Sequence, residues 1–163
     1  MALGGREGPP LRESVFGIDP GPVESAYAVV SPDQRVLHAE KVPNDSLIER
    51  IREAPPGHVA IESIQSFGMP VGRSTFDTCY TIGRLIQVCI DLEIPFTLYP
   101  RPEYTRRICG VGKVNDAVLR QALLLRFGGD KKGEALHALK GSTDKRSAFA
   151  VAAYHIDKAA AGT

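Results

Sequence analysis

The stretch Val15–Gly21, with the sequence VFGIDPG, constrains the fold more than any other part of the chain. Phe16 and Ile18 alternate with small or polar neighbours, as in a buried strand, and Pro20-Gly21 ends that strand with a turn. Asp19 therefore lies at the end of a buried strand, where an ionised carboxylate is costly unless a positive group meets it. Mg²⁺ or Mn²⁺ would suit such a hard oxygen ligand. The equally supported alternative is that Asp19 only opens an Asp-Pro-Gly turn.

The length of 163 residues suits a single domain with its own core. We expect a flexible leader at 1–14, one folded domain at 15–158 and a flexible tail at 159–163. The chain has no apolar run long enough to span a membrane and no secretory signal, which predicts a cytoplasmic protein of a bacterium or of a phage-infected cell. Its three cysteines are far apart and are interpreted as reduced, buried thiols: Cys79, Cys89 and Cys109.

The net charge of +1 hides an asymmetry between the two parts of the chain. Residues 1–100 hold 8 Lys and Arg against 13 Asp and Glu, whereas residues 101–163 hold 12 against 6. The basic part predicts a phosphate-binding face. For any single Lys or Arg, a solvated position on a helix is the better interpretation.

Hydrophobic periodicity and turn residues predict five strands. The first three, 15–19, 24–31 and 36–42, form an antiparallel meander, and the strands at 58–64 and 95–100 run parallel to the first if the helices between them are crossovers. The predicted fold is an α/β domain with a mixed sheet of order 3-2-1-4-5 and helices on both faces.

The helices are expected at 44–53, 73–92, 101–108, from 115 or 116 to 127, and 142–158, with 129–141 as a polar, mobile loop. The helix 73–92 is apolar over more than one stripe, so it must be buried on two sides. Either a second copy of the protein or a following helix covers the second side. The first alternative predicts a homodimer in which Gly83 allows close approach.

One further acid repeats the placement of Asp19 at the end of a strand, and another lies at the start of a helix that can bring it to the same place. Glu62 lies near the end of the apolar strand HVAIESI, and Asp144 lies in the first turn of an Ala-rich helix that can pack closely on the sheet. We expect both near Asp19. Taken alone, Glu62 is typical of an edge or capping residue, and Asp144 of an acid that complements a helix dipole.

The three acidic motifs together resemble the RuvC-type Holliday junction resolvases of the ribonuclease H superfamily. The motifs are FGIDPG around Asp19, AIES around Glu62 and DKRSAFAVA from Asp144. The segments QSFGMPVG and IGR look more like the phage and prophage branch than the housekeeping bacterial enzymes. One position departs from the housekeeping pattern, because Ser147 stands where that pattern has a second Asp.

The resemblance implies a homodimeric, magnesium-dependent endonuclease that cuts four-way DNA junctions in recombination and repair. It places Asp19, Glu62 and Asp144 as metal ligands around two Mg²⁺, for which Mn²⁺ would substitute. Two ions can activate a water and stabilise the leaving oxygen. We assign Asp19 to both ions, Glu62 to one and Asp144 to the other. A water, the Ser147 hydroxyl or another acid would replace the fourth carboxylate.

Further residues are candidates for supporting roles. Lys145, Lys113 and His137 are placed to stabilise or protonate near the scissile phosphate. Phe67, in the loop after Glu62, can stack on an exposed base or anchor its loop. The candidates for contacts to the DNA backbone are Arg106, Arg107, Lys113, Arg120 and Arg146.

The sequence is also compatible with other functions. The same acids would serve a nuclease of this fold that acts on other branched DNA or on RNA. The missing fourth acid favours a junction-binding protein without catalysis. An ATPase of the actin and sugar-kinase type needs a second comparable domain that this chain lacks. No nucleotide cofactor and no membrane partner are expected.

Overall fold

A computed structural model describes residues 11–162. It contains a five-stranded sheet of order β3-β2-β1-β4-β5, as predicted. The strands are β1 (Val15–Asp19), β2 (Glu24–Val30), β3 (Val36–Pro43), β4 (His58–Ser63) and β5 (Phe96–Pro100). β1 pairs with β2 antiparallel and with β4 parallel, and β4 pairs with β5 parallel. The predicted mixed sheet is therefore confirmed.

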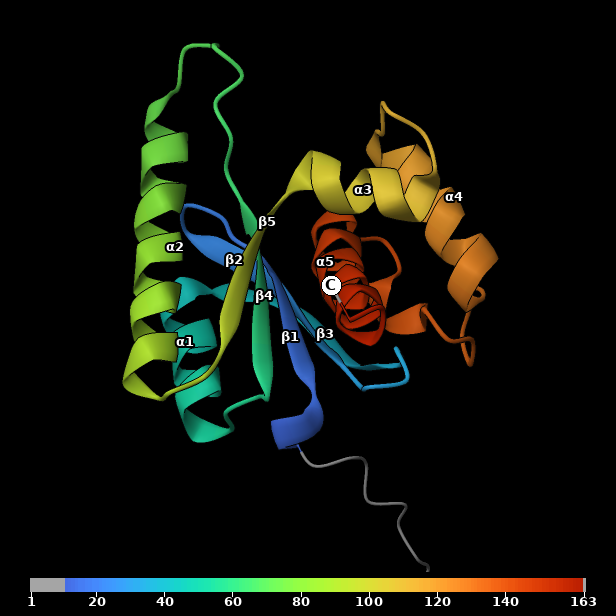
Figure 1. Cartoon of the computed structure of the whole chain (residues 1–163), viewed down its shortest axis with the longest axis horizontal. Coiled ribbons are helices and arrows are strands. Elements are labelled where there is room, and N and C mark those ends of the chain that lie inside the picture. The colour runs from blue at the N-terminus through green and yellow to red at the C-terminus, as the bar shows by residue number, and fades with distance from the viewer. Residues whose placement is uncertain (1–10, 163) are drawn as a thin grey trace, which may run out of the picture.

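Helices cover both faces of the sheet (Figure 1). One face packs against α1 (Asn44–Glu53) and α2 (Arg73–Asp91). The other packs against α5 (Thr143–Ala160), with α3 (Arg101–Cys109) and α4 (Asp116–Phe127) beyond it. Two short 3₁₀ helices complete the fold, η1 (Leu11–Glu13) and η2 (His137–Leu139).

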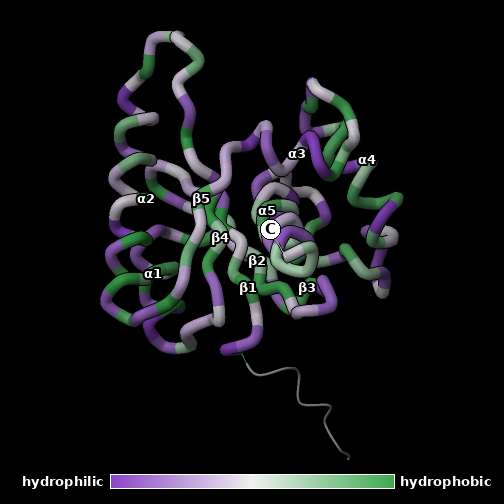
Figure 2. The backbone as a smooth tube through the Cα atoms, viewed as in Figure 1, coloured by the Kyte–Doolittle hydropathy of each residue, from purple (hydrophilic) through white to green (hydrophobic). Residues whose placement is uncertain are grey.

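The two faces of the sheet hold two apolar cores, because side chains alternate along each strand. Phe16, Ile18 and Ile61 belong to the core under α1 and α2, whereas Val15 and Ala60 belong to the core under α5. The hydrophobic stretches of the backbone accordingly include the central strands between the helical layers (Figure 2). Asp19 and Glu62 lie two residues after Gly17 and Ala60, so both face α5.

α5 lies very close to the sheet because both partners are small at the contact. A Cβ added at Gly17 would collide with the Ala148 carbonyl oxygen and come within 2.8 Å of the Ala152 Cβ. Every residue of α5 from Ser147 to Tyr154 is buried. This part of the helix is thus enclosed on all sides.

Two boundaries differ from expectation. Leu11–Glu13 form η1 and Ser14 is fully buried, where its backbone oxygen accepts from the Gly57 N–H, so the expected leader does not extend to residue 14. Residues 1–10 and 163 lie outside the described residues. At the other end α5 continues to Ala160, into the predicted tail.

The segment 129–141 is more structured than a polar, mobile loop. It contains η2, and Leu136 and Leu139 are buried in the core under α5. Its apolar residues are few but regularly placed. The abundance of Lys and Gly made the segment look like a polar loop in the sequence. In α4, by contrast, only Leu119 and Leu123 are buried, and Leu125 is 80% exposed.

α2 has one buried face and one exposed face. Ile82, Leu85 and Val88 pack on the sheet, whereas Phe76, Tyr80 and Ile90 are 52%, 67% and 54% exposed. Within residues 11–162 no following helix covers this second side, so that alternative is wrong. None of the described helices is both long and apolar enough to cross a membrane.

Candidate active site

Asp19, Glu62 and Asp144 come together at one end of the sheet. Ile18 pairs with Ile61, so Asp19 and Glu62 are each the next residue on neighbouring parallel strands. Asp144 lies in the first turn of α5, the helix that packs on β1. The loop 64–72 extends beyond this end of the sheet (Figure 1).

The turn after Asp19 is held by buried polar groups from three elements. The Gly21 N–H donates to the Ser25 hydroxyl at 3.1 Å, and that hydroxyl donates to the Asn44 side-chain oxygen at 2.6 Å. The Asn44 amide in turn donates to the Gly21 carbonyl at 3.1 Å and to the Thr81 hydroxyl at 3.0 Å. The Asn44 side chain thus fixes the position at which β1 ends.

The Asp19 carboxylate plays no part in that turn. Within residues 11–162 it accepts no hydrogen bond, which disfavours the interpretation of Asp19 as a turn-opening residue. Burial, the largest cause, and the carboxylates of Glu62 and Asp144 together raise the pKa of Asp19 from 3.8 to about 8, against the opposing effects of Arg101 and Lys41. A buried acid near two others is a place where a bound cation would be strongly favoured.

The Glu62 carboxylate, unlike that of Asp19, has a hydrogen-bond donor beside it. Its Oε2 accepts from the Tyr104 hydroxyl at 2.8 Å and lies 3.9 Å from Arg101 Nη1. Burial raises the pKa of Glu62, while the Tyr104 hydrogen bond and the Arg101 charge oppose that rise. Burial also raises the pKa of Tyr104, so its hydroxyl stays protonated and remains a donor to Glu62.

Asp144 is paired with a lysine from the far strand of the meander. Lys41 Nζ donates to Asp144 Oδ2 at 2.7 Å, and the two side chains are 45% and 42% exposed. Lys41 reaches the site because Asp19 pairs with Ala26 across the sheet, and Ala26 pairs with Lys41. The lysine therefore lies in the same row as Asp19, on the face covered by α5.

The donors fit a hard divalent cation in their chemistry, since all three are carboxylates. Their placement fits less closely. Among the described residues, no three His, Cys, Asp or Glu side chains gather closely enough to hold one ion together. Asp144 is directed to Lys41, so this side chain would have to leave its lysine to join Asp19 and Glu62 around an ion.

Ser147, at the position of the absent fourth acid, is buried and accepts a hydrogen bond from Arg101 Nη1 at 2.9 Å. Lys145 lies in the first turn of α5, where its backbone N–H donates to the capping Ser142 hydroxyl. His137 lies in η2, with its Nδ1 3.2 Å from the Asp130 carbonyl oxygen, and among the described residues no hydrogen bond or ion pair joins it to the three acids. The first two candidates thus lie on the site's own helix and the third lies apart.

The DNA-binding candidates are dispersed. Phe67 is 72% exposed in the loop 64–72, so the alternative that it is a buried anchor of its loop is wrong. Arg106 and Arg107 are exposed on α3, Lys113 is exposed in the following loop, and Arg146 is partly exposed on α5. Arg120 is paired with Asp130 at 2.9 Å.

Sequence reasoning missed Lys41, Arg101, Tyr104 and Asp116, because the contacts that bring these residues to the site join distant segments. Arg101 appeared only as one of many basic residues. Arg101 directly follows β5 and so lies at the same end of the sheet as Glu62, which could have identified it as a site residue from the sequence.

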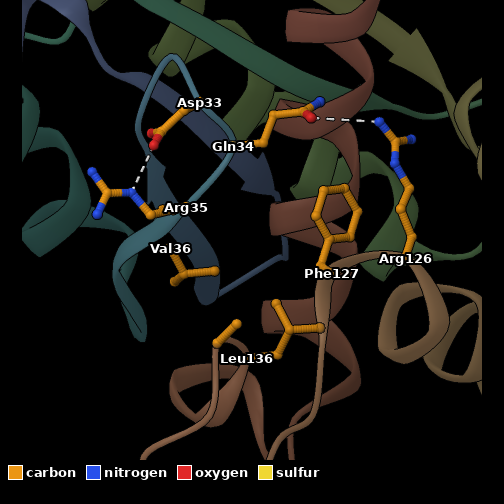
Figure 3. Close-up of a pocket in the computed structure, with 8 residues that line it drawn as sticks. Asp33, Gln34, Arg35, Val36, Arg126, Phe127 and Leu136 are labelled. Atoms are coloured by element: carbon orange, nitrogen blue, oxygen red, sulfur yellow. Dashed lines mark hydrogen bonds and ion pairs between the residues drawn. The ribbon is translucent and has the colours of Figure 1, made fainter.

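A separate pocket of about 360 Å³ lies between the β2–β3 turn and the end of α4 (Figure 3). Its polar side chains already have partners, because Arg35 pairs with Asp33 and Arg126 Nη2 donates to the Gln34 side-chain oxygen. It contains none of the candidate site residues, so we do not place the site there.

Comparison with solved structures finds close matches over nearly the whole chain. The Thermus thermophilus RuvC structure has a TM-score of 0.71 at 19% identity and covers 92% of this chain and 97% of its own. The chain has the fold of RuvC. T. thermophilus RuvC in complex with a Holliday junction substrate matches equally well, with a TM-score of 0.71, 20% identity and coverage of 93% and 97%. A Fowlpox virus resolvase in complex with Holliday junction DNA has a TM-score of 0.62 at 14% identity, with coverage of 90% and 98%.

These neighbours confirm the predicted ribonuclease H-like fold. No protein-family model matches the sequence, and no curated protein matches it. The likeness is therefore one of fold, and the function has to be argued from the site.

Proposed function

We propose that this protein is a structure-selective endodeoxyribonuclease that resolves four-way DNA junctions by metal-dependent hydrolysis of phosphodiester bonds. The observation that carries the proposal is the meeting of Asp19, Glu62 and Asp144 at one end of a RuvC-like sheet. The solved neighbours of the same fold include two in complex with Holliday junction DNA, which supports this substrate class.

Asp19, Glu62 and Asp144 would hold the divalent ions, and we keep the prediction of two Mg²⁺ per site with Mn²⁺ able to substitute. When bound, the ions supply an activated water and neutralise charge at the phosphate. The protein's own contribution is positional. The Gly21 turn fixes Asp19, Tyr104 holds Glu62 through one hydrogen bond, and the N-terminus of α5 carries Asp144.

The exposed side of α2 supports the proposed homodimer. Phe76, Tyr80, Gly83 and Ile90, together with the intervening Gln87, follow a spacing of four, three, four and three residues, which places them along one seam. A Cβ at Gly83 would meet nothing within 4 Å in this chain, which leaves room for close approach of a second helix. Two sites related by such a seam would cut two strands of a junction symmetrically.

The loop 64–72 and the basic surface complete the proposal for DNA binding. Phe67, Met69 and Val71 are exposed in a loop at the site's end of the sheet, which suits stacking on unpaired bases at a junction. The predicted basic residues of α3, α4 and α5 would contact phosphates and position the DNA without reading its sequence.

The proposal is tested by incubating the purified protein with a synthetic four-way junction and Mg²⁺, with linear duplex and an RNA–DNA hybrid as controls. We expect paired cuts in the junction only, no cutting in EDTA, and junction binding without cutting by Asp19→Asn. Binding should weaken steeply as salt rises. Full cleavage by Asp19→Asn would refute the assigned site.

One alternative has an observation in its favour. The Lys41–Asp144 ion pair and the incomplete convergence of the acids suit a protein that binds junctions without cutting them. It predicts tight binding to the junction and no cleavage with either Mg²⁺ or Mn²⁺. Cleavage of branched DNA or RNA other than the four-way junction would instead point to a related nuclease of different substrate range.

A further inference from the structure

Arg101 brings a guanidinium group into the cluster of acids. It is the first residue of α3 and directly follows β5. Its Nη1 donates to the Ser147 hydroxyl at 2.9 Å and to the Tyr104 hydroxyl at 3.3 Å, and its Nη2 donates to Asp116 Oδ1 at 2.9 Å. α3, α4 and α5 therefore each supply one acceptor, so the orientation of the guanidinium plane is defined.

These contacts leave part of the guanidinium available. An Arg side chain has five N–H donors, and three of those of Arg101 have acceptors within residues 11–162. Glu62 Oε2, at 3.9 Å, is beyond hydrogen-bond distance. The side chain is 31% exposed, so part of it is accessible to an anion from solvent.

A phosphodiester that approaches this site meets several negative groups. Asp19, Glu62, Asp144 and Asp116 all lie close enough for at least one of them to shift another's pKa. Arg101 and Lys41 are the two protein cations that act on Asp19. Lys41 and Arg101 are each paired with one carboxylate, that of Asp144 and that of Asp116, but only Arg101 is half-buried and has N–H donors without an acceptor. Arg101 is therefore the better placed to accept a phosphate.

The identity of residue 147 supports this role. A hydroxyl at 147 accepts from Arg101 without cancelling its charge, whereas a carboxylate at the same place would form a buried ion pair with it and compete with phosphate. We propose that Arg101 is a catalytic residue that binds a non-bridging oxygen of the scissile phosphate, held in orientation by the positioning residues Ser147 and Asp116. This inference rests on the proposed nuclease function.

The first measurement is the single-turnover rate of junction cleavage at saturating protein. We expect Arg101→Ala to lower the rate about 100-fold, the size typical for loss of one donor to a transition-state oxygen. Arg101→Lys should lower it about 10-fold, because it keeps a point charge and loses the planar fork. Arg35→Ala is the matched control, since Arg35 is 70% exposed and paired with Asp33 away from the acids.

The second measurement separates a phosphate contact from a purely structural role. Junction affinity is measured in the Asp19→Asn background, once with an ordinary junction and once with a neutral methylphosphonate at the bond that the wild type cuts. Arg101→Ala should weaken binding of the ordinary junction several-fold and leave binding of the neutral one unchanged. A loss of equal size on both junctions would overturn the inference.

The outcomes distinguish this inference from the proposed function. If the wild type does not cut the junction, both the proposed nuclease function and the role of Arg101 are refuted. If the wild type cuts and Arg101→Ala cuts within about threefold of its rate, only the role of Arg101 falls. Thermal melting checks that each variant is folded. If Arg101→Ala does not fold, the test uses Arg101→Lys instead. A wild-type cleavage rate for Arg101→Lys would refute a contact between the planar guanidinium and the phosphate.

Discussion

The raised pKa of Asp19 makes a quantitative prediction about stability. In the folded protein its pKa is about 8, against 3.8 for an ordinary Asp, and burial is the largest cause. Below pH 3.8 the group is protonated in both the folded and the unfolded states and costs nothing. As pH rises from 3.8 to 8 only the unfolded state loses its proton readily, so the folded state is progressively destabilised, and the full cost is reached above pH 8.

A shift of this size corresponds to about 6 kcal/mol at most, since each pKa unit is worth about 1.4 kcal/mol. Asp19→Asn removes the ionisable group and keeps its shape. In EDTA at pH 8.5 the variant should therefore melt above the wild type by up to roughly 20 °C, given about 2–4 °C per kcal/mol in a chain of this size. The advantage should shrink steadily as pH is lowered toward 4.

The assay is thermal melting from pH 4 to 9, with EDTA and with Mg²⁺. Mg²⁺ should raise the melting temperature of the wild type, because a ligand that binds only the folded state stabilises it, and should do little for Asp19→Asn. Asp91→Asn, at an exposed carboxylate on α2, serves as the control and should follow the wild type. An Asp19→Asn protein that is less stable than the wild type at pH 8.5 in EDTA would refute this account of the site.

Three further predictions concern other parts of the molecule. Gly17→Ala should lower the free energy of unfolding by about 3 kcal/mol or more, measured by urea denaturation, because its Cβ would collide with the Ala148 carbonyl and α5 would have to move. Lys41→Gln should strengthen Mg²⁺ binding about threefold in calorimetry, since it frees Asp144 from an exposed ion pair; unchanged affinity would mean that the pair does not compete. Tyr80→Glu should convert a dimer to a monomer in analytical ultracentrifugation, and a wild type that is already monomeric would contradict the α2 interface.

Much of the fold followed from local patterns in the sequence. The alternation around Phe16 and Ile18, the turn at Pro20-Gly21 and the short apolar run before Glu62 were sufficient to order the sheet. α5 was identified by its small residues, and Gly17 explains why they are needed there. These features could be predicted because they depend on neighbours in the chain or on strand and helix periodicity.

The contacts that define the chemistry of the site could not be predicted as readily from the sequence. The Lys41–Asp144 pair joins residues 103 positions apart, and the Arg101–Ser147 pair joins residues 46 apart. No periodicity links such positions, so the sequence identified the three acids but not the cations and the tyrosine that surround them. The exposed face of α2 was anticipated only as one of two alternatives, because an apolar stripe does not say which partner covers it.

Lys41 and Arg101 differ in how firmly they are held, and this difference affects how metal and phosphate would bind to the site. The Lys41–Asp144 pair is exposed on both sides, and exposed ion pairs contribute little free energy, so a divalent ion can displace the lysine at small cost. Arg101 is held by acceptors from three helices and is not displaced by an ion that binds the carboxylates. Lys41 thus offsets the negative charge before metal binds, and Arg101 keeps its positive charge for the phosphate. Ser147 belongs to this division, because a carboxylate at this position would add a second, buried ion pair to the Arg101–Asp116 pair and further reduce the positive charge available to the phosphate.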